Sequence, residues 1–291
     1  MKGLVEKANI LIEALPYMRS FYGKVFVIKY GGAAQTEDEL KDSFAQDIVL
    51  LSFIGIKPVI VHGGGPRISE TMKKMGKEPA FIQGQRVTDK DTMDIVEMVL
   101  GGLINKEIVT LINNHGGKAV GLSGKDGGLI NAKKKLIKKA KEQGEEIIDI
   151  GLVGEVESID AGILFSLERD GFIPVISPIG RGPKGETYNI NADYAASAIA
   201  SSLKAEKFIF LTDVEGIKNG KGDILSTLER SDIVRLIEEK VISGGMLPKV
   251  QACIRALEGG VGKTHVIDGR VPHCMLLEIF TKSGIGTEIV A

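Results

Sequence analysis

Three consecutive glycines at residues 63–65 restrict the possible folds of this chain more than any other feature. They follow an apolar, β-branched run that ends at His62, and they precede Pro66 and a helical pattern over residues 67–74. A strand that enters a helix through such a turn exposes several backbone N–H groups and directs a helix N-terminus at its ligand. One glycine would suffice for a tight turn, and proline suits the first helical turn. The stretch therefore predicts an anion-binding loop in an α/β protein, with phosphate as the preferred ligand.

A second strand has the same design. Residues 24–30 read as a buried strand that carries Lys29 near its end and is followed by Gly31 and Gly32. A lysine there is poorly explained as a solvated charge, whereas open α/β sheets bind ligands at the carboxyl ends of their strands. Further strand patterns alternate with helical ones at residues 119–123, 172–177, 207–212 and 264–267. The order predicts a mainly parallel open sheet, which residues 278–290 would close with a turn at Gly284 and Gly286.

Two segments keep alternative interpretations. Residues 4–15 have apolar positions at helical spacing, and Pro16 should end or kink this helix. It lies outside the α/β pattern, and its periodicity does not decide between packing on its own subunit and docking on another. Residues 133–141 are strongly basic; a solvated hairpin or loop is favoured because acidic residues follow, and a phosphate-attracting patch is the alternative.

Two motifs place polar side chains where simple structural roles do not account for them. Arg86 lies among apolar neighbours in an extended stretch, where it is either a solvated strand residue or a fork for a carboxylate. Asn189, Asn191 and Asp193 precede or begin a helix of small residues. One of the three can be the helix cap, and the other two predict a ligand site.

Composition excludes several classes of protein. The net charge of −1 gives no sign of nucleic-acid binding. No apolar run approaches the roughly 20 residues of a membrane span, and the charged start does not resemble a secretory signal. Cys253 and Cys274 suggest reduced core thiols in a cytoplasmic protein. The four histidines have no metal-binding spacing, so no protein metal site is predicted, and the stretch 259–264 lacks the first glycine and the context of a P-loop.

Taken together, six motifs resemble the amino acid kinase family, and within it the branch that acts on N-acetyl-L-glutamate. They are Lys29-x-Gly-Gly32, His62-Gly-Gly-Gly-Pro66, Gly84-Gln-Arg-Val-Thr-Asp89, Asn189-Ile-Asn-Ala-Asp193, Leu211-Thr-Asp-Val-x-Gly216 and Gly244-Gly-Met-x-x-Lys249. The resemblance covers essentially the whole chain. It implies a three-layer αβα sandwich with a mainly parallel open sheet and a kinked N-terminal helix. It also implies an oligomerisation helix at 1–23, an N-acetylglutamate lobe at 24–187 and an ATP lobe at 188–291.

The implied reaction is transfer of the γ-phosphoryl group of ATP to the side-chain carboxylate of N-acetyl-L-glutamate, in arginine biosynthesis. That carboxylate is ionised at pH 7, so no general base is needed. By resemblance, the catalytic residues are Lys29, Lys249 and Asp193. The implied binding residues are Gly64, Gly65, Arg86 and Asn189 for substrate, Gly31, Gly32 and Gly63 for phosphate, and Thr212, Asp213, Gly216 and Ile217 for nucleotide. Mg²⁺ would be held mainly by the phosphates.

The resemblance extends to regulation. Members of this branch that are inhibited by arginine share such an N-terminal helix, which links dimers into a hexameric ring, a trimer of dimers. Their inhibitor site resembles Tyr17, Lys207, His265, Glu278 and Gly284 here. Two alternatives stay open, namely another amino acid kinase acting on glutamate or carbamate, and a non-catalytic sensor of arginine or nucleotide. The presence of both lysines and Asp193 disfavours the sensor.

Overall fold

The computed structural model describes residues 1–35, 37–141 and 144–291. Within them, eight strands form one sheet in the order β12-β14-β13-β11-β1-β2-β8-β5, in which only β13 and β14 pair antiparallel. The strands are β1 (Val25–Tyr30), β2 (Lys57–His62), β5 (Ala119–Ser123), β8 (Ile173–Ser177), β11 (Lys207–Thr212), β12 (Thr227–Glu229), β13 (Lys263–Asp268) and β14 (Thr287–Val290). The predicted mainly parallel sheet is therefore confirmed.

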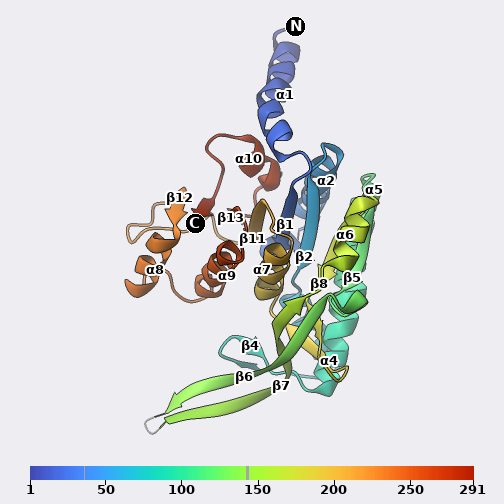
Figure 1. The fold of residues 1–291 in the computed structure, drawn as a ribbon, viewed down its shortest axis with the longest axis vertical. Helices are drawn as coiled ribbons and strands as arrows, with labels where there is room; N and C mark the ends of the chain where they lie inside the picture. The colour runs from blue at the N-terminus through green and yellow to red at the C-terminus, as the bar shows by residue number, and fades with distance from the viewer. Residues whose placement is uncertain (36, 142–143) are drawn as a thin grey trace.

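Helices cover both faces of this sheet, as Figure 1 shows. One face packs against α2 (Asp38–Phe53), α5 (Asn105–Asn114) and α10 (Cys274–Phe280), and the other against α6 (Gly162–Arg169), α7 (Ala192–Ser202), α8 (Arg230–Glu238) and α9 (Met246–Glu258). The alternation of side chains along a strand explains the two cores. On β1, Val27 belongs to the core with α7 and α9, while Phe26 and Ile28 belong to the core with α2. The fold is the expected three-layer αβα sandwich.

A hairpin projects from one end of the body (Figure 1). It consists of β6 (Ile130–Lys141) and β7 (Gly144–Ile159), which close into a small four-stranded sheet with β9 (Ile179–Arg181) and β10 (Thr187–Ile190). The basic stretch lies on β6, so the hairpin interpretation is confirmed. Lys134 pairs with Asp149 across the hairpin at 2.6 Å, and Lys133 pairs with Glu155 at 3.3 Å.

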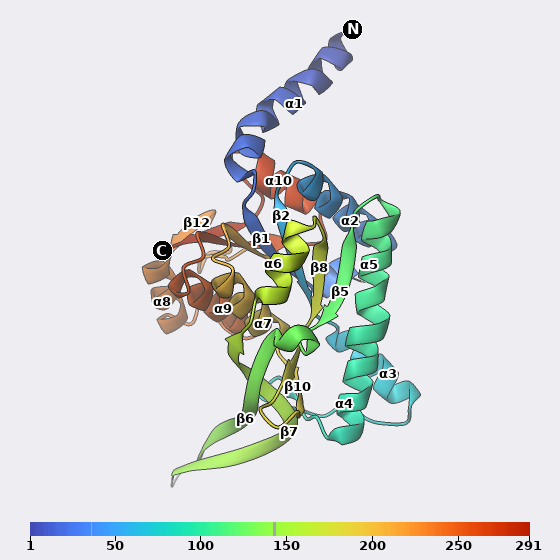
Figure 2. The same ribbon diagram turned by 45° about the vertical axis from the view of Figure 1, so that its right-hand side comes forward.

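Helix α1 (Lys2–Phe21) extends away from the body (Figure 2). Pro16 lies inside it, so of the two outcomes expected at this proline, an end and a kink, the end does not occur. Its last turns contact the body, where the rings of Phe21 and Phe26 meet edge to face at 5.2 Å. Further out, Ile10, Leu11 and Ile12 are 65–67% exposed. No helix in the described part of the chain is long and apolar enough to cross a membrane.

The C-terminal segment differs from the prediction. Residues 278–290 do not all join the sheet. Glu278 lies in α10, and within this segment only β14 forms a strand, which pairs with β13. The run from Cys274 to Phe280 buries Cys274, Met275 and Ile279 against the α2 face, at helical rather than alternating spacing.

The remaining elements are short or bridge the larger ones. They are α3 (Gly65–Lys74), α4 (Lys90–Glu97), a π-helical segment (Met98–Ile104) that joins α4 to α5, the hairpin of β3 (Phe81–Ile82) and β4 (Gln85–Arg86), and the 3₁₀ turns Gly32–Gln35 and Asp126–Gly128.

Candidate active site

The two glycine loops lie side by side at the carboxyl edge of the sheet. β1 and β2 pair in parallel with Tyr30 opposite His62, so both chains leave the sheet at the same level. The Gly63 N–H donates to the Tyr30 carbonyl at 2.9 Å, which joins the loops directly. Gly32 has the left-handed φ of +71° that favours glycine. A β-carbon added there would lie 3.9 Å from the backbone nitrogen of Asp213, so this loop also borders the loop that follows β11.

Three charged side chains converge beside these loops. Asp193 in the first turn of α7 binds Lys29 of β1 through Oδ1 at 3.1 Å and Lys249 of α9 through Oδ2 at 3.7 Å. Their side chains are 11%, 9% and 19% exposed, respectively. Asn191 caps α7 by accepting from the Asp193 N–H at 2.9 Å, which orients the aspartate. The cap role considered for one of the three polar residues therefore belongs to Asn191.

The triad of Lys29, Asp193 and Lys249 carries a net positive charge in a largely buried setting. Burial by itself would raise the pKa of Asp193, but the charges of the two lysines outweigh it and hold that pKa below its usual value. Burial lowers the pKa of Lys249, and the charge of Asp193 opposes this. Two cations that share one carboxylate keep donors for a further anion, so the arrangement suits a multiply charged group such as a phosphoryl group.

A cavity of about 560 Å³ opens beside the triad. We call it the front cavity. Eight of the predicted site residues line it: Lys29, Gly31, Gly32, Gly63, Gly64, Gly65, Asn189 and Asp193. Leu100, Ile104 and Ile108 form an apolar wall that sequence reasoning missed. Their only signal was a buried helical periodicity, which does not indicate what the helix faces.

Arg86 is buried but does not line the front cavity. Its guanidinium donates to the Gly65 carbonyl at 2.9 Å and to Ser69 Oγ at 2.8 Å, and it lies 4.7 Å from the ring centroid of Phe81. With 7% exposure, its interpretation as a solvated strand residue is wrong. Asn189 does line the cavity, and its amide donates to Thr88 Oγ1 at 3.3 Å.

A smaller cavity of about 340 Å³ lies beyond the loop that follows β11. Asp213, Gly216 and Ile217, which the resemblance assigns to the nucleotide, line it. Thr212 is buried at the strand end, and its Oγ1 donates to Asp213 Oδ1 at 3.1 Å. Arg270 also lines it and was missed. Its signal was available, because Arg270 follows the strand pattern at 264–267 and so belongs to the same edge.

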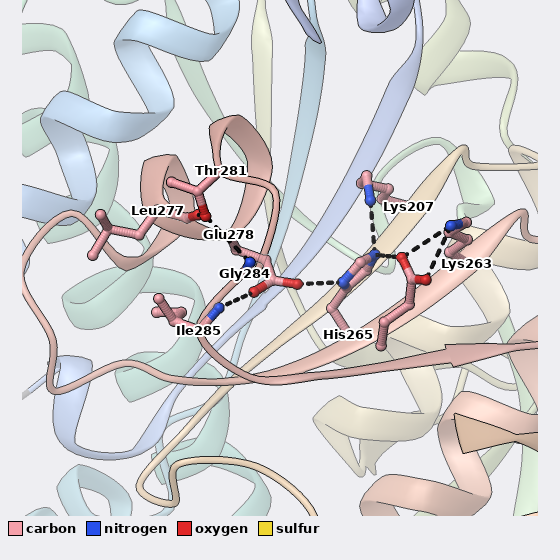
Figure 3. A network of polar contacts seen from close by, with 9 residues as sticks. Lys207, Lys263, His265, Leu277, Glu278, Thr281, Gly284 and Ile285 are labelled. Atoms are coloured by element: carbon pink, nitrogen blue, oxygen red, sulfur yellow. Dashed lines mark hydrogen bonds and ion pairs between the residues drawn. The ribbon is translucent and has the colours of Figure 1, made fainter. Parts of the chain in front are cut away.

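The residues predicted to bind arginine gather on the α10 side of the sheet, away from the glycine loops. Figure 3 shows Lys207 donating to His265 Nε2 at 2.9 Å, and His265 Nδ1 bonding Glu278 Oε1 at 2.6 Å. Glu278 Oε2 accepts the Ile285 N–H at 2.8 Å. Gly284 lies in the turn beside Glu278, and Tyr17 of α1 approaches the ring of Phe280 at 6.5 Å. Three of the five residues thus share one network, Gly284 lies in the adjoining turn, and Tyr17 reaches the helix that carries Glu278.

The described residues contain no group of three or more His, Cys, Asp or Glu side chains arranged to hold a metal ion.

Residues 24–268 match the profile described as the amino acid kinase family. The chain is 60% identical to the acetylglutamate kinase of Syntrophus aciditrophicus (strain SB), over 98% of this chain and 97% of that protein. It is 58% identical to the acetylglutamate kinase of Persephonella marina (strain DSM 14350 / EX-H1), over the full length of both.

Among solved structures, the chain is similar to N-acetylglutamate synthase from Neisseria gonorrhoeae, solved with coenzyme A and N-acetyl-glutamate. The TM-score is 0.84 at 26% identity, and the match covers 98% of this chain and 63% of the synthase. The chain thus spans less than two thirds of that protein.

Proposed function

The chain belongs to the amino acid kinase family, and we propose that it transfers the γ-phosphoryl group of ATP to the side-chain carboxylate of N-acetyl-L-glutamate. The product would be the acyl phosphate N-acetyl-L-glutamyl 5-phosphate. The single observation that carries the proposal is the triad of Lys29, Asp193 and Lys249, two members of which line the front cavity. The third, Lys249, feels the charge of Asp213, which lines the cavity beyond β11. The names of the full-length relatives support the choice of acceptor.

The front cavity is the proposed site of N-acetylglutamate. Backbone N–H groups at Gly64 and Gly65 and the amide of Asn189 would bind carboxylate oxygens. The apolar wall of Leu100, Ile104 and Ile108 suits the acetyl methyl and the methylene groups. Arg86 would attract the α-carboxylate through its positive charge from behind the loop, where it now donates hydrogen bonds to the Gly65 carbonyl and Ser69 Oγ.

The cavity beyond β11 is the proposed nucleotide site, with Asp213, Gly216 and Ile217 at its wall and Thr212 beneath it. The γ-phosphoryl group would then lie over the Gly31–Gly32 loop, which lines the front cavity and borders the backbone of Asp213. ATP would carry Mg²⁺ on its own phosphates, where the ion neutralises charge during transfer.

The chemistry follows from charge and position. An ionised carboxylate attacks the γ-phosphorus in line with the leaving oxygen of ADP, so that one P–O bond forms as the other breaks. The ammonium groups of Lys29 and Lys249 stabilise negative charge on the transferring group and on ADP. Asp193 holds both lysines in place, and glycine N–H groups orient the equatorial oxygens.

ADP release tests the proposal when N-acetylglutamate, glutamate and a mixture of bicarbonate and ammonia are supplied in parallel. We expect ADP formation with N-acetylglutamate and little with the others. Turnover that is fastest with glutamate or with the carbamate precursors would assign the chain to another amino acid kinase. Absence of turnover with all three would leave a non-catalytic sensor of arginine or nucleotide.

We further infer feedback inhibition by arginine and assembly through α1. The network of Lys207, His265 and Glu278 supports the inhibitor site, because a buried carboxylate is an apt partner for a guanidinium. In the proposed complex, arginine would replace contacts that Glu278 now makes to His265 and Ile285. The exposed apolar side chains Ile10, Leu11 and Ile12 support docking of α1 on another subunit, in a hexamer built as a trimer of dimers.

Arginine titration of the activity tests the inhibitor site. Wild-type protein should lose activity, and Glu278→Gln should keep its activity while its half-inhibitory arginine concentration rises at least about tenfold, the equivalent of one lost charge-assisted contact. Wild-type activity that does not respond to saturating arginine would refute the inhibition.

A further inference from the structure

A cavity of about 500 Å³ lies behind the triad, between the β6–β7 hairpin and the helices α7 and α9. We call it the rear cavity. Its charged and aromatic lining consists of Lys135 on β6, Glu155 and Glu157 on β7, Tyr194 on α7 and Arg255 on α9. Ile190 and Asn191 line both the rear and the front cavity. A single segment of chain, which leads into α7, therefore separates the two.

Two cations share one aromatic ring at this cavity. Lys135 Nζ lies 5.6 Å from the ring centroid of Tyr194, and Arg255 Cζ lies 4.7 Å from the same centroid. Within the described residues, neither cation forms an ion pair with a carboxylate. The neighbouring lysines behave differently, because Lys133 pairs with Glu155 and Lys134 pairs with Asp149. Glu155, whose charge acts on Lys135, already forms an ion pair with Lys133.

Lys135 has no ion-pair partner among the described residues, although Glu155 and Glu157 line the same cavity. Burial lowers the pKa of Lys135, and the charge of Arg255 adds to this effect while Glu155 opposes it. A compact anion between the two cations would remove their mutual repulsion. A guanidinium binds two oxygens at once and an ammonium a third, so phosphate or a dicarboxylate fits this donor set.

Two helices link the rear cavity to the triad. Tyr194 directly follows Asp193 on α7, and α9 carries both Arg255 and Lys249. The helices are tied together, because Ser197 Oγ donates to the Ala252 carbonyl at 2.8 Å and Tyr194 Oη donates to Gln251 Oε1 at 3.2 Å. A ligand that joins the hairpin to α9 would restrain the helix that carries Lys249. The hydrogen bonds between α9 and α7 would pass this restraint to the helix that carries Asp193.

We propose that the rear cavity is a regulatory site for a compact dianion, held by Lys135 and Arg255 across the ring of Tyr194. The binding site stands on its own residues and does not depend on the proposed kinase activity. It also gives the basic stretch a role at one position, whereas Lys133 and Lys134 form hairpin ion pairs.

Residue-specific labelling of Lys135 by an amine-acylating reagent, read by mass spectrometry, tests this site directly. Inorganic phosphate is the first probe and succinate the second, each compared with sodium chloride at the same ionic strength. The labelling rate should scale with the unoccupied fraction, so phosphate at about twice its dissociation constant should slow it about threefold. Lys134 in the same digest is the matched control and should be labelled at an unchanged rate.

The variants separate a built site from a general salt effect. Arg255→Gln and Tyr194→Leu should each abolish the protection of Lys135, as a ratio of rates with and without phosphate, while Lys134→Gln should retain it. Protection by succinate but not phosphate would assign a dicarboxylate. The proposal is overturned if sodium chloride protects equally, if neither anion protects, or if protection persists in Arg255→Gln. None of these outcomes depends on turnover.

Discussion

Single residues at the carboxyl edge have separable roles, and Asp193 connects them. Each of its oxygens binds a different lysine, one from a strand and one from a helix. Its depressed pKa means that it stays ionised at neutral pH, so the two ammonium groups remain within reach of one transferring group. Lys249 lies close enough to Asp213 for that carboxylate to act on its pKa, which suggests that it serves the nucleotide side.

Lys249→Ala should lower kcat far more than it changes the KM for N-acetylglutamate. A donor that acts mainly on transition-state charge is worth about 10²–10³ in kcat. Steady-state kinetics checks this, with Lys263→Ala, an exposed lysine paired with Glu288, as control. A raised KM at unchanged kcat would make Lys249 a binding residue instead.

His62 should make stability depend on pH. It is fully buried, with Nδ1 at 3.0 Å from the Gly63 carbonyl and Nε2 at 3.2 Å from Asn105 Nδ2, and burial lowers its pKa to about 4. Between that value and the usual 6.5, the unfolded chain binds the extra proton, so the free energy of unfolding should fall as pH falls from 6.5 to 4. The expected total is about 3 kcal/mol.

Urea unfolding of wild type and His62→Gln across this range isolates the effect. Asp47, whose pKa burial raises to about 6, works in the opposite direction and is present in both proteins. The stability advantage of wild type should shrink toward pH 4. A difference that stays constant with pH would contradict the assignment.

At the level of elements, the loop after β1 depends on the absence of side chains. A β-carbon at Gly31 would lie 2.8 Å from Lys29 Nζ, which is the mobile end of a flexible side chain. Gly31→Ala should therefore displace the ammonium group and leave the backbone in place. We therefore expect the loop to keep its fold with the added methyl group but to lose the present position of the Lys29 ammonium group.

We expect Gly31→Ala to reduce kcat at least about tenfold, because a misplaced charge loses much of its transition-state contact. Its melting temperature should stay close to that of wild type. Gly101→Ala is the matched control, because a β-carbon there meets nothing within 4 Å. Full activity in Gly31→Ala would show that Lys29 does not need its present position.

At the scale of the whole molecule, one sheet runs through both proposed lobes without a break, and the division at residues 187 and 188 stays a prediction. The catalytic edge lies where β1 borders β2 on one side and β11 on the other. The two proposed lobes are therefore not separate domains. They differ in the ligand that each would bind, one on either side of β1.

Removal of α1 should change the assembly. Deleting residues 1–14 leaves Tyr17 and Phe21 against the body and removes the exposed Ile10, Leu11 and Ile12. Light scattering should show a hexamer for the full chain and a dimer for the truncated one, with activity retained in the absence of arginine. An unchanged mass would refute the role of α1.

The strand and helix patterns determined the mainly parallel α/β sheet and the two glycine loops, and the motif resemblance added the three-layer αβα arrangement. Strand and helix periodicities are local, and parallel strands bring their carboxyl ends to one edge, so Lys29 and Gly63 were predictable as neighbours. The helix-start pattern had marked Asp193 as a candidate ligand residue, but only the motif resemblance joined it to Lys249, since no local pattern connects residues so far apart.

Only the tertiary structure decided where Arg86 points, which side chains wall the front cavity, and that Lys135, Tyr194 and Arg255 meet. These contacts join residues far apart in the chain, across helix faces and a hairpin whose packing angles no periodicity encodes. Tertiary structure also decided the conformation at Glu278. The sequence predicted that this residue begins the closing strand, whereas it lies in α10, which packs against the α2 face.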